Sequence, residues 1–268
     1  MNFYDKYFQI TKKNNSFVCL GLDTDLHKIP SFLQKETFPS LIFNKRIIDE
    51  TYQYVAAYKP NFAFYLAQGL PGIECLKATL EYIPPDIPTI IDLKAGDIGN
   101  TMEQYAEGVF GYFHADAMTI NPLMGIEVIK SCLTKDNSFA FALALTSNES
   151  ASDFFYHQNL YLKISSMINR VGEHKLGAVV GATHSESLKL LRQQMPKNIF
   201  LVPGIGVQGG DLAQVCQLAA SSGEEPRLII NISRGIIYAD QTFSFAKIAQ
   251  QKTIELRSEI NHYLSELS

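Results

Sequence analysis

Three charged side chains follow the apolar run TII in the segment TIIDLKAGDIGNT, which covers residues 89–101. Side chains on a strand alternate, so Asp92 and Lys94 point to the same side and the leucine between them points away. The Ala-Gly pair that follows permits a sharp turn, which we expect to return Asp97 to the same ammonium. Two carboxylates beside one ammonium keep it protonated, and such a site suits a general acid next to a strained substrate carboxylate. An isolated Asp-x-Lys is more simply a structural ion pair, and the second aspartate favours chemistry.

A second group of residues fits a phosphate group. Four glycines within residues 204–210 follow an apolar run and allow backbone N–H groups to approach an anion. Ser233 and Arg234 follow another apolar run and supply backbone amides and a guanidinium near a helix start. We therefore expect Arg234 to bind phosphate and Gln208 to close over it, although Gln208 is also compatible with an ordinary solvent-facing amide.

Eight short apolar runs alternate with stretches of helical periodicity, as expected of repeated βα units around a parallel sheet. Several runs are apolar at consecutive positions, which is typical of strands buried on both faces. We expect an α/β protein, a (β/α)8 TIM barrel that forms a single domain over residues 1–268, although this pattern alone also allows an open doubly wound sheet. The expected strands are Val18–Asp23, Ala57–Phe62, Thr89–Lys94, Ala117–Asn121, Phe139–Thr146, Ala178–Ala182, Phe200–Pro203 and Leu228–Ile232.

Polar side chains follow these runs at their carboxyl ends, where barrels place their active sites. Core packing does not explain such a distribution, so it favours the barrel. These residues are Asp23, Lys59, Asp92, Lys94, Asn121, Thr146, Ser147, Thr183, Ser233 and Arg234.

The last part of the chain has the pattern of two outer helices. One is expected to begin at a capping Asp211 and to end near Gly223. The final stretch after Phe245 carries an apolar stripe that includes Ala249 and Ile260, and we expect it to close the barrel.

Composition limits the classes of partner. The formal net charge is −4, and no Lys/Arg cluster could follow a nucleic-acid backbone, so we expect no polymeric nucleic acid. The longest apolar run, Phe139–Leu145, is far below the roughly 20 residues that cross a bilayer. The four cysteines are widely spaced, and no signal sequence is visible, which favours the cytoplasm. The six histidines lack metal-ligand spacing, so we expect no metal site.

The segment DLKAGDIGNT resembles the Asp-x-Lys-x-x-Asp signature of the orotidine 5′-phosphate decarboxylases, in their bacterial subgroup with the longer chain. Further blocks match that family in order from about residue 18 to 239. They are CLGLD, YKPNFAFY, LTSN, VVGAT, VPGIGVQGG and NISRGIIYA.

The resemblance implies conversion of orotidine 5′-monophosphate to uridine 5′-monophosphate without a cofactor. It implies that Lys94 delivers a proton to C6 of the pyrimidine and that Asp92 lies against the departing carboxylate. Asp23 and Lys59 would bind the ribose hydroxyls and extend the charge network.

The resemblance also implies a homodimer, in which Asp97 and Thr101 reach the ribose in the neighbouring subunit's site. Ser147 would hydrogen-bond the edge of the pyrimidine, and Pro203 would flank the ring. Ser233 and Arg234 would serve the phosphate end.

Two positions depart from the family pattern. Relatives usually follow Thr-Ser-Asn with Pro-Gly, whereas this chain has Glu149 and Ser150, which leaves the path of that loop open. Leu66 stands where relatives often carry an acidic residue, a change expected to affect packing rather than chemistry.

Two other functions compete with this interpretation of the sequence. Related barrels that act on sugar phosphates with a divalent metal, such as keto-gulonate phosphate decarboxylases, share the Asp-x-Lys-x-x-Asp pattern. A barrel that only binds nucleotides would require a broken charged centre, and this one is intact.

Overall fold

The computed structural model describes residues 1–182, 185–205, 211–219 and 226–266. Within them, eight parallel strands form one sheet in the order β2-β1-β8-β7-β6-β5-β4-β3. Bridges from Tyr58 to Thr89 and from Asn61 to Asp92 join the two edge strands, so the sheet curves into a nearly closed barrel and the doubly wound alternative is excluded. The strands are β1 (Val18–Gly21), β2 (Ala57–Lys59), β3 (Ile90–Ala95), β4 (Ala117–Ile120), β5 (Phe139–Leu145), β6 (Leu176–Val180), β7 (Phe200–Pro203) and β8 (Leu228–Ile232).

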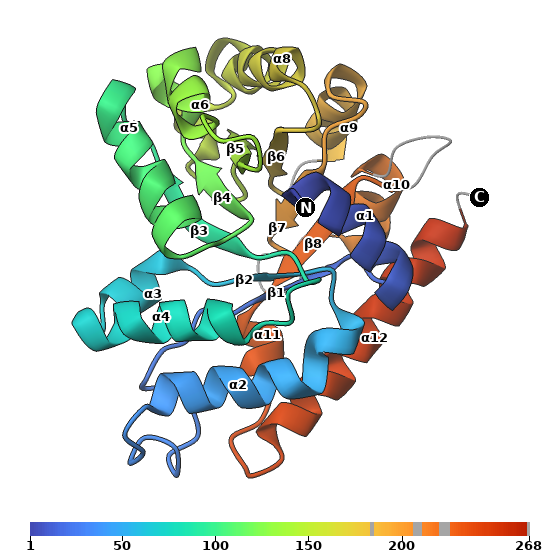
Figure 1. Ribbon diagram of the computed structural model, residues 1–268. Coiled ribbons are helices and arrows are strands. Elements are labelled where there is room, and N and C mark those ends of the chain that lie inside the picture. Colours follow the sequence, from blue (N-terminus) through green and yellow to red (C-terminus); the bar gives the residue numbers. More distant parts are fainter. Residues whose placement is uncertain (183–184, 206–210, 220–225, 267–268) are drawn as a thin grey trace.

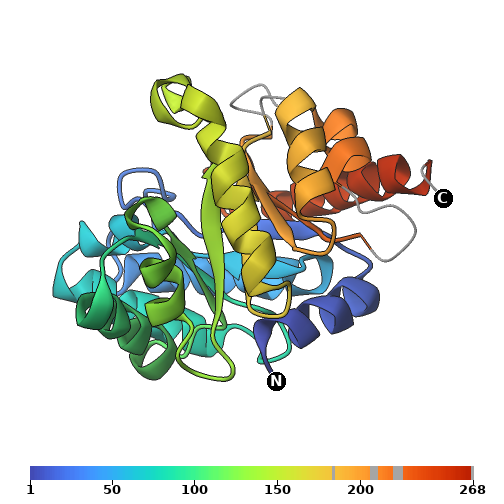
Figure 2. The same ribbon diagram turned by 90° about the horizontal axis from the view of Figure 1, so that it is seen from above.

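Helices surround the strands on the outside of the barrel (Figures 1 and 2). No helix in the described part of the chain combines the length and the apolar character needed to cross a membrane. The helices are α1 (Phe3–Asn14), α2 (Pro39–Thr51), α3 (Phe62–Leu66), α4 (Leu70–Tyr82), α5 (Gly99–Ala106), α6 (Ile126–Cys132), α7 (Ala151–Phe154), α8 (Leu160–Val171), α9 (Ser185–Gln194), α10 (Leu212–Ala219), α11 (Arg234–Ile237) and α12 (Phe245–Ser265).

All eight expected strands are present, and most differ from the expectation by one or two residues at an end. The main correction concerns β2, which we expected to continue to Phe62. It ends at Lys59 because Pro60 follows and Asn61 caps the next helix, its Oδ1 accepting a hydrogen bond from the N–H of Ala63 at 3.1 Å.

The amino end of the barrel is closed by α1. The ring of Phe3 stacks on that of Phe139 with centroids 4.7 Å apart, and the Tyr7 hydroxyl donates to the carbonyl of Pro226 at 2.6 Å. Phe139 and Phe141 fill the interior, and a Cβ on Gly177 would lie 2.6 Å from the Phe141 ring. Side chains therefore fill the barrel at the amino ends of its strands, and the carboxyl ends are left for a site.

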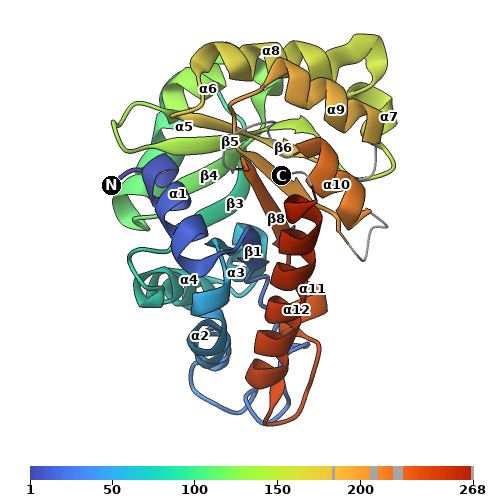
Figure 3. The same cartoon turned by 90° about the vertical axis from the view of Figure 1, so that its right-hand side faces the viewer.

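The last helices agree with their sequence pattern. The carboxylate of Asp211 accepts from the N–H of Gln214 at 3.2 Å at the start of α10, as a helix cap does. The expected end at Gly223 lies outside the described residues. In α12 the expected stripe is largely buried, including Phe245, Ala249 and Ile260, and this helix runs beside α2 (Figure 3).

Candidate active site

The charged side chains point into the barrel and form a layer next to its apolar interior, nearer to the carboxyl ends of the strands. Ile90 and Ala117 belong to the packed interior, and two positions further along the same strands stand Asp92 and Thr119. Because side chains alternate along a strand, residues two apart share a face. Lys59 occupies the equivalent place at the end of β2. The pattern that fills the barrel thus also directs these groups into its open end.

Asp92 is the centre of this layer, and its carboxylate accepts four hydrogen bonds. Its Oδ1 accepts from Lys94 Nζ at 2.6 Å and from Thr119 Oγ1 at 2.8 Å. Its Oδ2 accepts from Lys59 Nζ at 2.7 Å and from Asn61 Nδ2 at 3.4 Å. The observed order is therefore Lys59–Asp92–Lys94, one carboxylate between two ammonium groups.

Asp92 and Lys94 meet as expected, but not through a regular strand. The pairing of β3 with β4 shifts register between Ile91 and Ala95, and Lys94 has a φ of 51°. A left-handed conformation is unfavourable for a lysine by about 1–2 kcal/mol. The irregular backbone, rather than simple alternation, directs Lys94 toward Asp92.

The cluster is electrostatically coupled because Lys59 and Asp92 are both buried. Burial disfavours the Asp92 carboxylate, but the ammonium groups of Lys59 and Lys94 outweigh burial and hold the pKa of Asp92 well below its usual range. Burial likewise disfavours the Lys59 ammonium, but Asp92 and Asp23 outweigh it and raise the pKa of Lys59. Both groups are therefore charged at neutral pH.

Polar atoms without partners gather where β1 meets β8. Asp23 Oδ1, Asn231 Oδ1 and Ser233 Oγ are buried and find no hydrogen-bond partner among the residues that the structure describes. Burial raises the pKa of Asp23, opposed by Lys59. The backbones approach closely here, because a Cβ on Gly21 would lie 2.7 Å from Ser233 Cβ. Buried polar atoms left unpaired cost free energy, so this set is suited to a polar ligand.

Two cavities adjoin at the charged cluster. One of about 160 Å³ is lined by Asp23, Asn231, Ser233 and Arg234, among others. The other, of about 350 Å³, extends over β4 to β7 and is lined by Lys94, Thr119, Leu143 and Ser147, among others. Lys59, Asp92 and Pro203 line both cavities. An elongated ligand can therefore lie across the cluster with its two ends in different surroundings.

The smaller cavity contains the expected phosphate-binding residues that the structure describes. Arg234 is exposed at its rim, Ser233 is buried, and Gly204 has a φ of 98°. Gln208 lies outside the described residues, as do Thr183 and the remaining glycines of the loop within 206–210.

The larger cavity contains Ser147, which stands against β6. A Cβ on Gly181 would lie 2.7 Å from the Ser147 Cα, so glycine is required for this approach. The chain that departs from the family pattern at Glu149 and Ser150 leads into the short helix α7, with the N–H of Ala151 donating to the carbonyl of Asn148 at 3.0 Å. Leu66 is 57% exposed, so its side chain lies largely on the surface of this chain.

Asp97 is not where the sequence alone predicted it within one subunit. Its Oδ1 accepts from the N–H of Ile98 at 2.8 Å, and in the described chain it makes no ion pair with Lys94. Thr101 is exposed on α5. Within the described part of a single chain the ion pairs form the series Lys59–Asp92–Lys94, and the Asp–Lys–Asp series stays a prediction for two subunits together.

Thr119 and Asn61 are site residues that sequence reasoning did not single out. Thr119 is a polar residue inside the apolar strand β4, and that polarity is its signal in the sequence. Asn61 lies in the family block YKPN. Its Oδ1 caps a helix while its Nδ2 donates to Asp92, and the sequence does not indicate the second contact.

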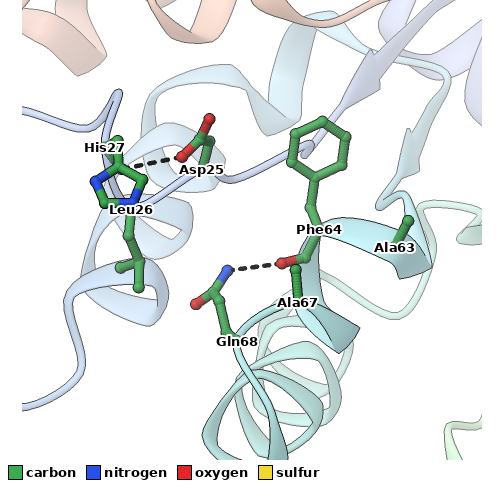
Figure 4. Close-up of a pocket in the computed structure, with 7 residues that line it drawn as sticks. All are labelled: Asp25, Leu26, His27, Ala63, Phe64, Ala67 and Gln68. Carbon is green, nitrogen blue, oxygen red and sulfur yellow. Dashed lines mark hydrogen bonds between the residues drawn. The ribbon is translucent and has the colours of Figure 1, made fainter.

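A separate cavity of about 420 Å³ lies beside α3 (Figure 4). There the N–H of His27 donates to Asp25 Oδ1 at 3.0 Å, and Gln68 Nε2 donates to the carbonyl of Phe64 at 3.0 Å. No residue of the charged cluster lines it. Among the described residues, no group of three or more His, Cys, Asp and Glu side chains is arranged to hold a metal ion.

A parallel barrel whose strand ends carry a buried ion-pair cluster, open to adjoining cavities, has the architecture of an enzyme. Residues 16–247 match the family model described as Orotidine 5′-phosphate decarboxylase / HUMPS family. The chain is 45% identical over 267 residues to the orotidine 5′-phosphate decarboxylase of Christiangramia forsetii, with 97% of each chain covered. It is 40% identical to that of Parabacteroides distasonis, covering 96% of this chain and 94% of the relative.

A solved structure gives the same result for the fold. The OMP decarboxylase of Leishmania donovani superposes with a TM-score of 0.83 at 28% identity, and 99% of each chain is covered. The chain belongs to the orotidine 5′-phosphate decarboxylase / HUMPS family, and it is an enzyme of the carboxy-lyase class.

Proposed function

We propose that this enzyme decarboxylates orotidine 5′-monophosphate to uridine 5′-monophosphate, the last step of de novo pyrimidine synthesis, without metal or cofactor. The observation that carries the proposal is the Lys59–Asp92–Lys94 cluster at the junction of two cavities. Ser147 at one side suits the edge of a base, and Arg234 at the other suits a phosphate. The ribose would lie between them, near Asp23 and Lys59.

In the proposed reaction the bond between C6 and the carboxyl carbon breaks, and its electron pair stays on C6. Carbon dioxide leaves, and the Lys94 ammonium supplies the proton that forms the new C6–H bond. Until that transfer, the ammonium stabilises the negative charge at C6. The Lys94 side chain is 48% exposed, so the neutral amine can regain a proton from solvent.

Asp92 contributes through its permanent charge. Because its pKa is held low, it stays ionised beside the substrate carboxylate and raises the energy of the bound ground state. That repulsion must be offset by binding elsewhere, and Arg234 at the phosphate end is suited to it. Closure of Gln208 over the phosphate would add to this binding. Enzymes of slow reactions lower the barrier by up to about 23 kcal/mol, so remote binding must contribute.

We also propose that the active unit is a homodimer, with Asp97 and Thr101 completing the neighbouring subunit's site. Two observations support it: Asp97 makes no ion pair with Lys94 of its own chain, and the adjacent Ile98 is 52% exposed. Residues 1–268 would form one domain in each subunit. The four free, buried cysteines suit the reducing cytoplasm, where we expect the enzyme to act.

One assay tests the proposed reaction. Purified protein is mixed with orotidine 5′-monophosphate, with and without a chelator, and the loss of orotate absorbance is followed. We expect the wild-type protein to react at equal rates in both samples. With Lys94→Ala we expect the orotate absorbance to stay unchanged. A rate that disappears with the chelator and returns with magnesium would instead favour the metal-dependent sugar-phosphate class.

A further inference from the structure

Thr119 uses its whole hydrogen-bonding capacity on the catalytic strand. Its side chain is buried in β4, only 1% exposed. Its hydroxyl accepts from the N–H of Leu93 at 3.0 Å and from the N–H of Lys94 at 2.9 Å, and it donates to Asp92 Oδ1 at 2.8 Å. A hydroxyl has one donor and two acceptor positions, so all three are occupied.

These bonds lie where the regular sheet is interrupted. The pairing between β3 and β4 shifts register between Ile91 and Ala95, and the two N–H groups that Thr119 accepts lie inside that interval. Backbone N–H groups in a partly buried strand need a hydrogen-bond partner, and here a side chain provides it in place of a strand carbonyl. Thr119 thereby stabilises the irregular backbone of β3.

The same irregularity directs Lys94. Its left-handed φ of 51° is a conformation that persists only where the surroundings fix it. Thr119 holds the Lys94 N–H directly, and it donates to the same Asp92 oxygen that Lys94 Nζ reaches at 2.6 Å. One hydroxyl therefore fixes both the backbone that carries the ammonium and the carboxylate that receives it.

We propose that Thr119 is a positioning residue that sets the placement of Lys94 Nζ relative to Asp92 and to the reacting carbon. The catalytic part of this inference rests on the proposed decarboxylation. A misplacement of about 1 Å can reduce turnover about 100-fold, so a small relaxation of this backbone is sufficient to affect the reaction.

The test compares Thr119→Val, which keeps the shape and removes the hydroxyl, with Thr119→Ser, which keeps the hydroxyl. We expect Thr119→Val to lower kcat about 10-fold to 100-fold with KM changed less than about 3-fold, and Thr119→Ser to retain most of the wild-type kcat. Thr253→Val is the matched control, because Thr253 is also buried and, among the described residues, its hydroxyl bonds within its own helix, to the carbonyl of Ala249 in α12. The Thr253→Val variant should keep the wild-type kcat.

A crystal structure of Thr119→Val separates this inference from the proposed substrate. We expect Lys94 to leave its left-handed conformation and Nζ to move away from Asp92 Oδ1, whether or not the wild type decarboxylates orotidine 5′-monophosphate. If Thr119→Val does not fold, Thr119→Cys, with its weaker donor and acceptor, is expected to show the same changes to a smaller degree. Wild-type kcat together with an unmoved Lys94 in either variant would overturn the proposal.

Discussion

Lys94 and Asp92 are separated by one residue, and their side chains meet where the pairing of β3 with β4 shifts register, with Nζ 2.6 Å from Oδ1. Lys94 reaches this position with a φ of 51°, which L-residues rarely adopt. The strain lies at the residue that we propose as proton donor, and unusual backbone conformations often mark functional sites. The geometry therefore makes separate predictions for activity and for stability.

Replacing Lys94 should abolish turnover in every variant, while stability should depend on the replacement. Glycine adopts a positive φ without cost, so Lys94→Gly should have a free energy of unfolding about 1 kcal/mol above that of Lys94→Ala. Urea unfolding of the two folded, inactive variants measures the difference.

Two outcomes would contradict this prediction. Equal stability of the glycine and alanine variants would mean that position 94 is not held in the left-handed region. Near-normal turnover in either variant would exclude Lys94 as the proton donor.

The Asp92 carboxylate should make stability depend on pH. Its folded-state pKa lies below its unfolded value, so its contribution is present above about pH 4 and is lost as the pH falls toward the folded-state pKa. Asp92→Asn should lower the free energy of unfolding by about 3 kcal/mol at pH 7, because two ammonium groups lose their shared partner. The difference in free energy of unfolding between wild type and Asp92→Asn should be smaller at pH 3 than at pH 7.

An exposed ion pair provides the control for that experiment. Asp86 pairs with Lys13 at 2.6 Å, but both side chains are on the surface. Asp86→Asn should therefore change the free energy of unfolding by less than about 1 kcal/mol. A gap for Asp92→Asn that stays constant from pH 7 to pH 3 would contradict the low pKa of Asp92.

Arg234 should act mainly through the phosphate of the substrate. Its removal deletes charge-assisted hydrogen bonds, so Arg234→Ala should raise KM about 10-fold to 100-fold, and Arg234→Lys should raise it less. Steady-state kinetics measure this change, with Arg46→Ala as the control because Arg46 is exposed on α2. With orotidine, which lacks the phosphate, Arg234→Ala and wild type should behave alike, and an equal loss on both substrates would exclude phosphate binding.

Much of the barrel could be predicted from the sequence because parallel strands buried on both faces leave continuous apolar runs, as in β5 and β8. Strand ends were less predictable. The end of β2 depended on the helix cap made by Asn61, and the irregularity in β3 depends on a hydroxyl from the neighbouring strand. The contact between Lys94 and Thr119 joins residues 25 positions apart, and such a contact leaves no local pattern in the sequence.

The site was predictable to the extent that its charges stand at strand ends. Asp92, Lys94 and Lys59 come together as expected, with Asp23 in the cavity beside them. Asp97 does not pair with Lys94 of its own chain, and its carboxylate instead accepts a hydrogen bond from the N–H of Ile98. Local spacing reveals neither where the chain after Lys94 leads nor which side chains a second subunit contributes.

The homodimer prediction follows from the position of Asp97 and is tested by mixing two inactive variants. Lys94→Ala and Asp97→Ala should each be inactive as homodimers, for different reasons. In a mixed dimer, one site would lack both residues, and the other would combine an intact Lys94 with an intact Asp97 of the partner subunit. Random exchange makes about half of the dimers mixed, so activity should recover to about a quarter of the wild-type value after the subunits are dissociated and reassembled.

Lys94→Ala mixed with Arg234→Ala is the control. If Arg234 serves the same chain's site as Lys94, that mixture should gain no activity from exchange. Absence of recovery with Asp97→Ala, in a sample whose subunits have exchanged, would place Asp97 outside the neighbouring site.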